Sequence, residues 1–170
     1  GFIDTSNSYF YCNIETTHTS ANNHKINLDG NLAAIINKIE ISVSGSSGKV
    51  ETIDDYNVFH LYDQVWNSGV EDITYQNAVN GGSVPALDWK AKGAELDKAG
   101  TAGKSVILAV KLKNGFLQSY YNKALPQGLP QFTIEITLES FDRAFVAAGG
   151  DLAAKVYKVT EARFYAPVYQ

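Results

Sequence analysis

The sequence contains no methionine, one cysteine, three histidines and four prolines among its 170 residues. With Cys12 alone, the chain cannot form an internal disulfide or a zinc site built from several cysteines. It has no N-x-Ser/Thr glycosylation acceptor, which together with the missing disulfides agrees with assembly in a reducing compartment. No apolar run approaches the roughly 18 residues of a membrane-spanning helix, and no signal peptide is recognisable.

Positive charge and catalytic motifs are also scarce. The net charge is −4 and the isoelectric point is about 5.3, which argues against a dedicated nucleic-acid surface. The nucleophile-elbow, P-loop and dinucleotide-binding patterns are missing. His18, His24 and His60 lack metal-site spacing, so a cupin-type enzyme is the poorest of the interpretations considered. We therefore expect a protein that is not an enzyme and that holds no cofactor and no metal.

The residues that are present favour sheet. Apolar residues make up 45% of the chain, with ten tyrosines and eight phenylalanines. In Phe132–Glu139, large apolar residues alternate with Thr and Glu, which predicts a strand with one buried and one exposed face. Strands of this kind, without regular alternation with helices, indicate a sandwich of antiparallel strands. The predicted strands are 9–15, 35–44, 70–75, 105–113, 116–121, 132–139 and 156–168.

Three local features refine this prediction. Asn114-Gly115 is the sharpest hairpin signal in the chain, because both residues tolerate positive φ. The apolar phase of 156–168 shifts near Glu161, which predicts a β-bulge. Asn37 breaks the alternation of 35–44, and Cys12 is expected to be a buried, unreactive thiol.

The period of the apolar residues changes in 54–66. Tyr56, Phe59, Tyr62 and Trp66 lie three or four residues apart, which predicts a helix with one apolar face that Asp54 or Asp55 caps. This helix is expected to cover an end or an edge of the sheets. A second, short helix is expected over 141–148, capped by Ser140 and ended by Gly149-Gly150. Residues 81–104 form a long excursion, and residues 1–8 form an arm.

Two blocks of sequence resemble the first jelly roll of the double-jelly-roll major capsid proteins of DNA viruses, the lineage of polinton-like viruses, virophages, large DNA viruses and tailless phages. The first block is the strand 36–41, the Ser/Gly turn 44–48, and Ile53, Tyr56 and Asn57 at the entry to the helix. The second contains 107–112, Asn114-Gly115-Phe116-Leu117, Leu125-Pro126 and 132–138, and the run 157–164 resembles the closing strand of the family.

The resemblance implies an all-β fold, an antiparallel eight-stranded jelly-roll sandwich with one or two short helices in its connections. Residues 1–8 would be an arm and 9–170 a single jelly-roll domain. This domain would be either the first of two, with the second beyond Gln170, or a single-jelly-roll relative of the family; the first option is favoured because the sequence stops right after a predicted strand. The protein would be a structural capsid protein of the virion that forms trimeric, pseudo-hexagonal capsomers of an icosahedral shell.

The partners implied are the other subunits of a homotrimer, neighbouring capsomers, minor capsid or penton proteins and an internal membrane, with no specific nucleic acid. Aromatic side chains are the natural contacts between subunits, because buried aromatics contribute most to interface energy. The predicted subunit-interface residues are Tyr56, Phe59, Tyr62, Trp66, Phe164 and Tyr165.

A carbohydrate-binding β-sandwich, such as a lectin-like or fibre-tip module, is the alternative from another class. The Tyr-rich strand Tyr9–Tyr11 would then line a sugar-binding groove, although a sheet core or a subunit interface explains the same rings equally well.

Overall fold

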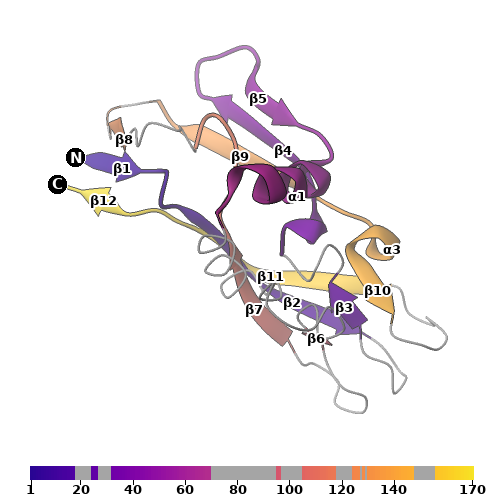
Figure 1. Cartoon of the computed structure of the whole chain (residues 1–170). Coiled ribbons are helices and arrows are strands. Elements are labelled where there is room, and N and C mark those ends of the chain that lie inside the picture. The colour runs from indigo at the N-terminus through magenta and orange to yellow at the C-terminus, as the bar shows by residue number, and fades with distance from the viewer. Residues whose placement is uncertain are drawn as a thin grey trace.

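The computed structural model of the chain describes residues 1–17, 24–26, 32–69, 95–96, 105–117, 124–126, 128, 130–147 and 156–170. This part of the chain is mostly β, with antiparallel strand pairing and two short α-helices (Figure 1). The prediction of an all-β antiparallel fold is confirmed at this level. The predicted strand at 70–75, residues 118–121 of the predicted strand at 116–121, and most of the excursion lie outside the described residues.

The described elements comprise several strands of only two or three residues, so the expected count of eight has no one-to-one match. In chain order they are β1 (Phe2–Asp4), β2 (Tyr9–Thr17), β3 (His24–Ile26), the 3-10 helix η2 (Leu32–Ile35), β4 (Ile36–Val43), β5 (Lys49–Ile53), α1 (Tyr56–Asn67), β6 (Glu95–Leu96), β7 (Ser105–Val110), β8 (Ala124–Pro126), β9 (Phe132–Leu138), α3 (Phe141–Ala144), β10 (Phe145–Ala147), β11 (Val156–Tyr165) and β12 (Val168–Tyr169).

The first four strands pair with the last four in reverse order. β1 pairs with β12, β2 with β11, β3 with β10 and β4 with β9. The paired residues step inward together, from Phe2–Tyr169 through Ile14–Val159 to Ile41–Ile134. The two halves of the chain therefore form one long antiparallel ribbon. The N- and C-termini of the chain lie side by side at one end of this ribbon (Figure 1).

A further strand lies on the other side of each N-terminal strand. β8, β7 and β6 pair with β1, β2 and β3, and β5 pairs with β4. Each of the four three-stranded sheets thus has an N-terminal strand in its middle. A middle strand satisfies its backbone donors and acceptors on both sides, so the N-terminal half of the chain supplies the centre of the fold.

The core lies where the sheets of β2 and β4 face each other through η2. Phe10, Cys12 and Ile14 alternate along β2 and are all buried, whereas Tyr9 and Tyr11 are half-buried. Both faces of this strand are therefore at least partly covered, as predicted, and Cys12 is buried as expected. The core cluster consists of Phe10, Cys12, Ile14, Leu32, Ala33, Ala34, Ile35, Ile36, Ile39, Ile41, Tyr56, Val110, Leu112, Leu117, Phe141, Ala144 and Phe145.

The alternating strand β9 has the two faces predicted for it. Phe132, Ile134 and Ile136 pack against the core, while the Thr and Glu side chains between them are exposed. Leu138, expected on the apolar face, is 41% exposed at the end of the strand. Its partner β4 departs from regular alternation where the register shifts between Ile36 and Lys38. The shift sets Asn37 outside the pairing, which explains why this residue interrupts the apolar pattern.

The predicted irregularity in the last long strand is confirmed. The pairing of β11 with β2 shifts between Thr160 and Arg163, and Glu161 has a φ of 52°. A non-glycine residue in this left-handed region is uncommon and is typical of a bulge. The bulge therefore allows the apolar phase of the strand to change at this residue.

The Asn114-Gly115 prediction is wrong in the described residues. β7 ends at Val110, and Gly115–Leu117 form a turn in place of the start of a partner strand. The Glu51 carboxylate accepts the N–H groups of Gly115 and Phe116 at 2.7 and 2.9 Å. The Asn114 side chain accepts the N–H of Leu117 at 2.8 Å. Side chains thus close this turn. β7 pairs with β2, whereas the sequence predicts that it pairs with a strand at 116–121.

Two other segments also differ from expectation. Residues 1–8, expected to be an arm, contain β1, whose Asp4 N–H donates to Pro167 O at 2.9 Å, and the side chains of Thr5 and Ser8 are buried. The helix expected over 141–148 is the single turn α3, after which the chain continues as β10. β10 pairs with β3, and this pairing replaces helix from Phe145 onward.

Candidate interaction surface

Helix α1 exists as predicted, and apart from Tyr56 it turns its polar side toward the core. Its buried residues are Tyr56 and the polar Asn57, His60, Asp63 and Gln64. Its exposed residues are large and apolar: Trp66 is 71% exposed and Tyr62 63%. We call the exposed group the α1 patch; it consists of Val58, Phe59, Tyr62, Val65 and Trp66.

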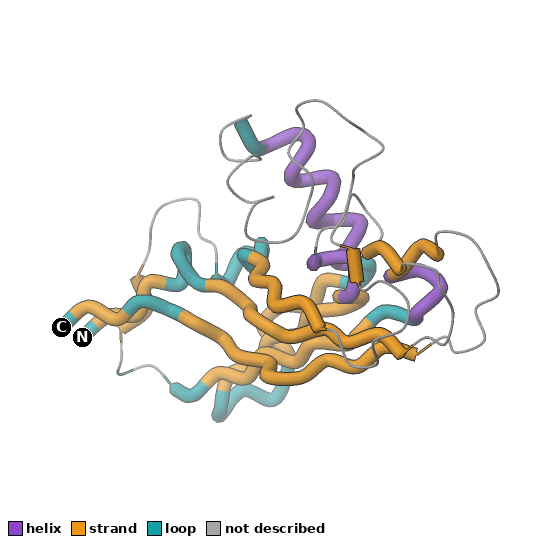
Figure 2. The backbone as a smooth tube through the Cα atoms, turned by 90° about the horizontal axis from the view of Figure 1, so that it is seen from below, coloured by secondary structure: helices purple, strands orange, loops and turns teal. Residues whose placement is uncertain are grey.

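The polar side of α1 points inward because it has partners there. The Asp63 carboxylate lies 2.5 Å from Lys113 Nζ, and both side chains are about nine-tenths buried. Asn67 Nδ2 donates to Asp63 at 2.7 Å, and Lys113 Nζ also donates to Ser68 Oγ at 3.2 Å. A buried ion pair of this kind is tolerated only when further hydrogen bonds satisfy both groups. α1 thus lies on one side of the strands, next to η2 and β4 (Figure 2), and its polar side bonds to Lys113, after β7, and to Glu139, after β9.

Tyr56 does not belong to the surface to which the sequence assigned it. It is fully buried, and its hydroxyl oxygen accepts the Lys113 N–H at 2.6 Å. Burial raises its pKa above the usual value, and the charges of Asp63 and Glu51 act in the same direction. Tyr56 thus connects α1 to the segment after β7 as a core residue and cannot contact another subunit.

His60 lies beside Tyr56 in the same buried layer, with a ring-to-ring distance of 5.8 Å. Burial lowers its pKa to about 4, and the charge of Lys113 adds to this shift. Asp63 and the backbone of Lys111 oppose the shift, but neither ring nitrogen has a hydrogen bond of good geometry. His60 is therefore held in its neutral form at neutral pH.

This shift predicts how stability depends on pH. Between pH 6.5, the usual value for histidine, and pH 4 the unfolded chain binds a proton at His60 that the folded chain rejects, so the free energy of unfolding falls with falling pH. The shift corresponds to about 3 kcal/mol of free energy of unfolding, which is fully present above pH 6.5 and fully lost near pH 4. Urea unfolding at several pH values measures it, and His60→Gln should flatten the profile in this window. A His60→Gln profile as steep as that of the wild type would contradict the assignment.

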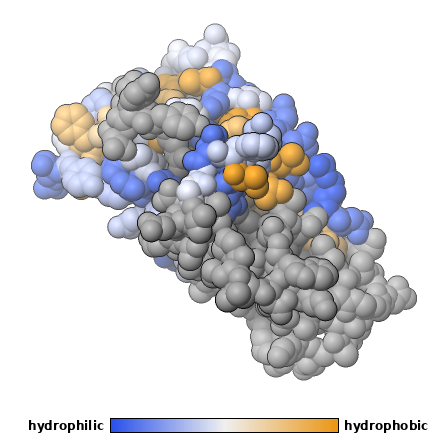
Figure 3. All heavy atoms as spheres, in the orientation of Figure 1, coloured by the Kyte–Doolittle hydropathy of each residue, from blue (hydrophilic) through white to orange (hydrophobic). Residues whose placement is uncertain are grey.

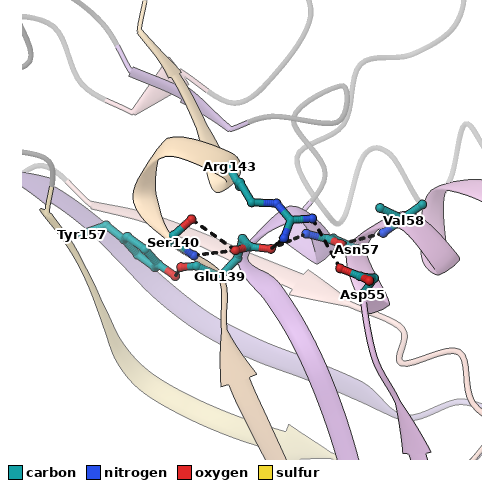
Figure 4. A network of polar contacts seen from close by, with 7 residues as sticks. All are labelled: Asp55, Asn57, Val58, Glu139, Ser140, Arg143 and Tyr157. Atoms are coloured by element: carbon teal, nitrogen blue, oxygen red, sulfur yellow. Dashed lines mark hydrogen bonds and ion pairs between the residues drawn. The ribbon is translucent and has the colours of Figure 1, made fainter.

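Glu139 is a second buried polar junction, at the end of β9 (Figure 4). Its carboxylate accepts the Asn57 amide at 3.1 Å and the Ser140 N–H at 2.8 Å. Arg143 lies 3.4 Å from the same carboxylate, and Tyr157 donates its hydroxyl hydrogen to the Glu139 carbonyl at 2.5 Å. One residue therefore connects the starts of α1 and α3 to β9 and β11.

The N-terminal end of α1 is not capped as predicted. Asp55 occupies the cap position with a left-handed φ of 48°, and its side chain makes no capping hydrogen bond. Its carboxylate instead lies 3.4 Å from Arg143, while Asp54 pairs with Lys38 at 3.3 Å. Ser140 likewise points its hydroxyl toward Glu139 and does not cap α3.

A second group of exposed apolar side chains surrounds the two chain ends. Tyr165, a predicted interface residue, is 66% exposed, and Phe164, also predicted, is exposed beside it. Phe2 and Tyr169 pair directly across β1 and β12, so their side chains share a face. We call this group the terminal patch; it lies on both faces of the strands, because consecutive strand residues point to opposite faces, and it consists of Phe2, Phe164, Tyr165, Val168 and Tyr169. Figure 3 shows apolar atoms near this end and, at a separate place, in the region of α1.

The described ranges place some of the residues that could bind a metal ion or act as a nucleophile. There, no three His, Cys, Asp or Glu side chains come together as they would around a metal ion. Burial raises the pKa of the Cys12 thiol to about 12, so it is a poor nucleophile. His18 and the side chain of His24 lie outside the described residues. Of the helices that are described, none has the length and hydropathy needed to cross a bilayer.

The sequence therefore identified the exposed residues Phe59, Tyr62 and Trp66 of α1, but it did not identify the polar side of the helix as the side that faces the core. Phe59, Tyr62 and Trp66 are exposed as an interface requires, and Val58 and Val65 extend the same surface. A signal for this orientation was present, because Asn57, His60, Asp63 and Gln64 repeat with the same helical spacing. Comparisons of the chain with protein-family models, with curated proteins and with solved structures each returned no match.

Proposed function

We propose that this chain is a structural, non-enzymatic subunit of a viral capsid, a jelly roll that forms trimeric, pseudo-hexagonal capsomers of an icosahedral shell. The resemblance of the sequence to double-jelly-roll capsid proteins motivates the proposal. The reverse-order strand pairing supports it, because a jelly roll is a long antiparallel ribbon curled into two sheets. In this proposal the chain acts in the virion, and neighbouring capsomers, minor capsid or penton proteins and an internal membrane are its further partners.

The observation that carries the proposal is the presence of two separate groups of exposed apolar side chains, the α1 patch and the terminal patch. Exposed groups of large apolar side chains mark interaction sites on soluble proteins. A shell subunit must contact its trimer partners and the next capsomer, so it needs more than one such surface. A protein that binds a single partner needs only one such surface.

The carbohydrate-binding alternative receives less support. It needs the rings of Tyr9–Tyr11 to line an open groove, but Phe10 is buried and the rings of Tyr9 and Tyr11 are half-buried. β2 also lies between β7 and β11. Sugar titration by calorimetry would favour this alternative if it gave saturable heat.

The test is the mass of the full-length chain in solution. Native mass spectrometry and sedimentation velocity should show a trimer, and larger assemblies should appear as concentration rises. Electron micrographs of the concentrated sample should show hexagonal tiles or shells. A chain that stays monomeric at every concentration would overturn the proposal.

A further inference from the structure

We propose that the α1 patch binds the α1 patch of a second copy of this chain across a two-fold axis. The inference rests on the proposed function and assigns a contact within it: α1 joins neighbouring capsomers, while the three subunits of one capsomer are held together by other surfaces. Three properties of the helix carry the assignment, namely its fixed orientation, its neutrality and its self-complementary form.

The orientation of the patch is fixed before any partner binds. Turning α1 to bury Tyr62 and Trp66 would break the Asp63–Lys113 pair and the Asn57–Glu139 hydrogen bond. Both of these contacts are buried, so their separated groups would be left without partners. The apolar side chains thus stay outside in the free chain, and a partner meets a surface that needs no rearrangement.

The patch is also electrically neutral. Asp63 is the only charged residue in α1, and it is turned inward toward Lys113. No lysine or arginine lies in the helix to attract phosphate groups or an anionic membrane. Two copies of the patch meet without repulsion between like charges, and a charged partner gains no attraction from it. These properties favour a second apolar and neutral surface, and an identical α1 patch is one.

The form of the patch suits pairing with itself. Val58, Tyr62 and Trp66 form a row at i, i+4 and i+8 along the helix, with Tyr62 near its middle. In a two-fold contact the same surface serves both partners, whereas a closed three-fold ring uses two different surfaces on each subunit. A row of this kind on one helix can pack against the same row of another. Self-pairing through α1 therefore adds dimeric links between trimers.

The size of the patch fits a link that acts in many copies. A helix of 12 residues is about 18 Å long, so the contact falls well short of the roughly 800 Å² per partner of a stable complex. One such contact is weak and reversible. Many such contacts between trimers strengthen the assembly together, because after the first contact forms the next ones form at high effective concentration.

Disulfide trapping tests the two-fold geometry directly. Tyr62→Cys places a thiol at the centre of the patch, and diamide, which takes two electrons and two protons from a pair of thiols, should join two copies through position 62. The matched control is Thr133→Cys, on the exposed face of β9. Cys12 is fully buried and should stay reduced in both variants. We expect at least tenfold more covalent dimer from Tyr62→Cys on non-reducing gels.

A second variant separates this inference from the proposed function. Trp66→Ser should weaken association between trimers at least tenfold in sedimentation velocity, while the trimers and the circular dichroism spectrum persist. Equal trapping at positions 62 and 133, or trimers that dissociate when Trp66 is changed, would overturn the two-fold assignment and leave the capsid proposal intact. Flotation of the wild type, but not of Trp66→Ser, with phosphatidylserine vesicles would also overturn it. A wild-type chain that never forms trimers would count against the proposed function itself.

Discussion

Replacing Lys113 with methionine should lower the free energy of unfolding by about 4 kcal/mol, because it leaves the Asp63 carboxylate buried without its cation. The ion pair spans 2.5 Å between two side chains that are about nine-tenths buried. Methionine retains most of the length of the lysine, so the change removes the charge more than the packing. Urea denaturation at pH 7, followed by circular dichroism, measures the loss.

A double-mutant cycle separates the ion pair from the rest of the site. Asp63→Leu together with Lys113→Met should recover much of the loss, since no buried charge then remains. Lys158→Met, on an exposed position of β11, is the matched control and should change stability by less than about 0.5 kcal/mol. A Lys113→Met variant as stable as Lys158→Met would show that the pair does not hold α1.

Removing the carboxylate of Glu139 is the second change with a large expected effect. Glu139→Ala takes away the acceptor for the buried Asn57 amide and for the N–H and hydroxyl groups of Ser140, which are only partly buried. A buried donor left without a partner costs about 1–3 kcal/mol, and the partly buried donors of Ser140 add less because water can reach them, so the total should be on the order of 3 kcal/mol. The free energy of unfolding in urea gives the measurement.

Two variants on β9 control this experiment. Glu139→Gln keeps one acceptor oxygen and should be less destabilising than alanine by more than about 1 kcal/mol. Glu135→Ala removes the same kind of side chain from the exposed face of the same strand and should be close to neutral. If Glu135→Ala were as destabilising as Glu139→Ala, strand propensity and not the polar junction would explain the result.

These two clusters connect stability to the proposed assembly. Asp63 with Lys113, and Asn57 with Glu139, fix the polar side of α1 against the fold. The exposed position of Tyr62 and Trp66 follows from these contacts. A variant that weakens either cluster should therefore also weaken contacts between capsomers, although it changes no residue of the α1 patch.

The sequence by itself determined the elements whose pattern is local. Alternation in β9 set its two faces, the shifted phase in β11 located the bulge at Glu161, and the period of residues 56–66 located α1. These features depend on side-chain direction along a single strand or helix, which is fixed by backbone geometry. The terminal aromatics Phe164 and Tyr165 were also recognised as surface residues from sequence.

Only the tertiary structure decided which side of α1 faces the core and which strands pair. The helix has an apolar and a polar stripe of the same period, and hydrophobicity alone favours burying the apolar one. Lys113 and Glu139 reverse this choice from positions about 50 and 80 residues away, a coupling that no local window contains. In the same way, Glu51 turns Asn114-Gly115 into a closed turn, and β7 pairs with β2. Side chains distant in sequence therefore determined which residues of α1 are exposed.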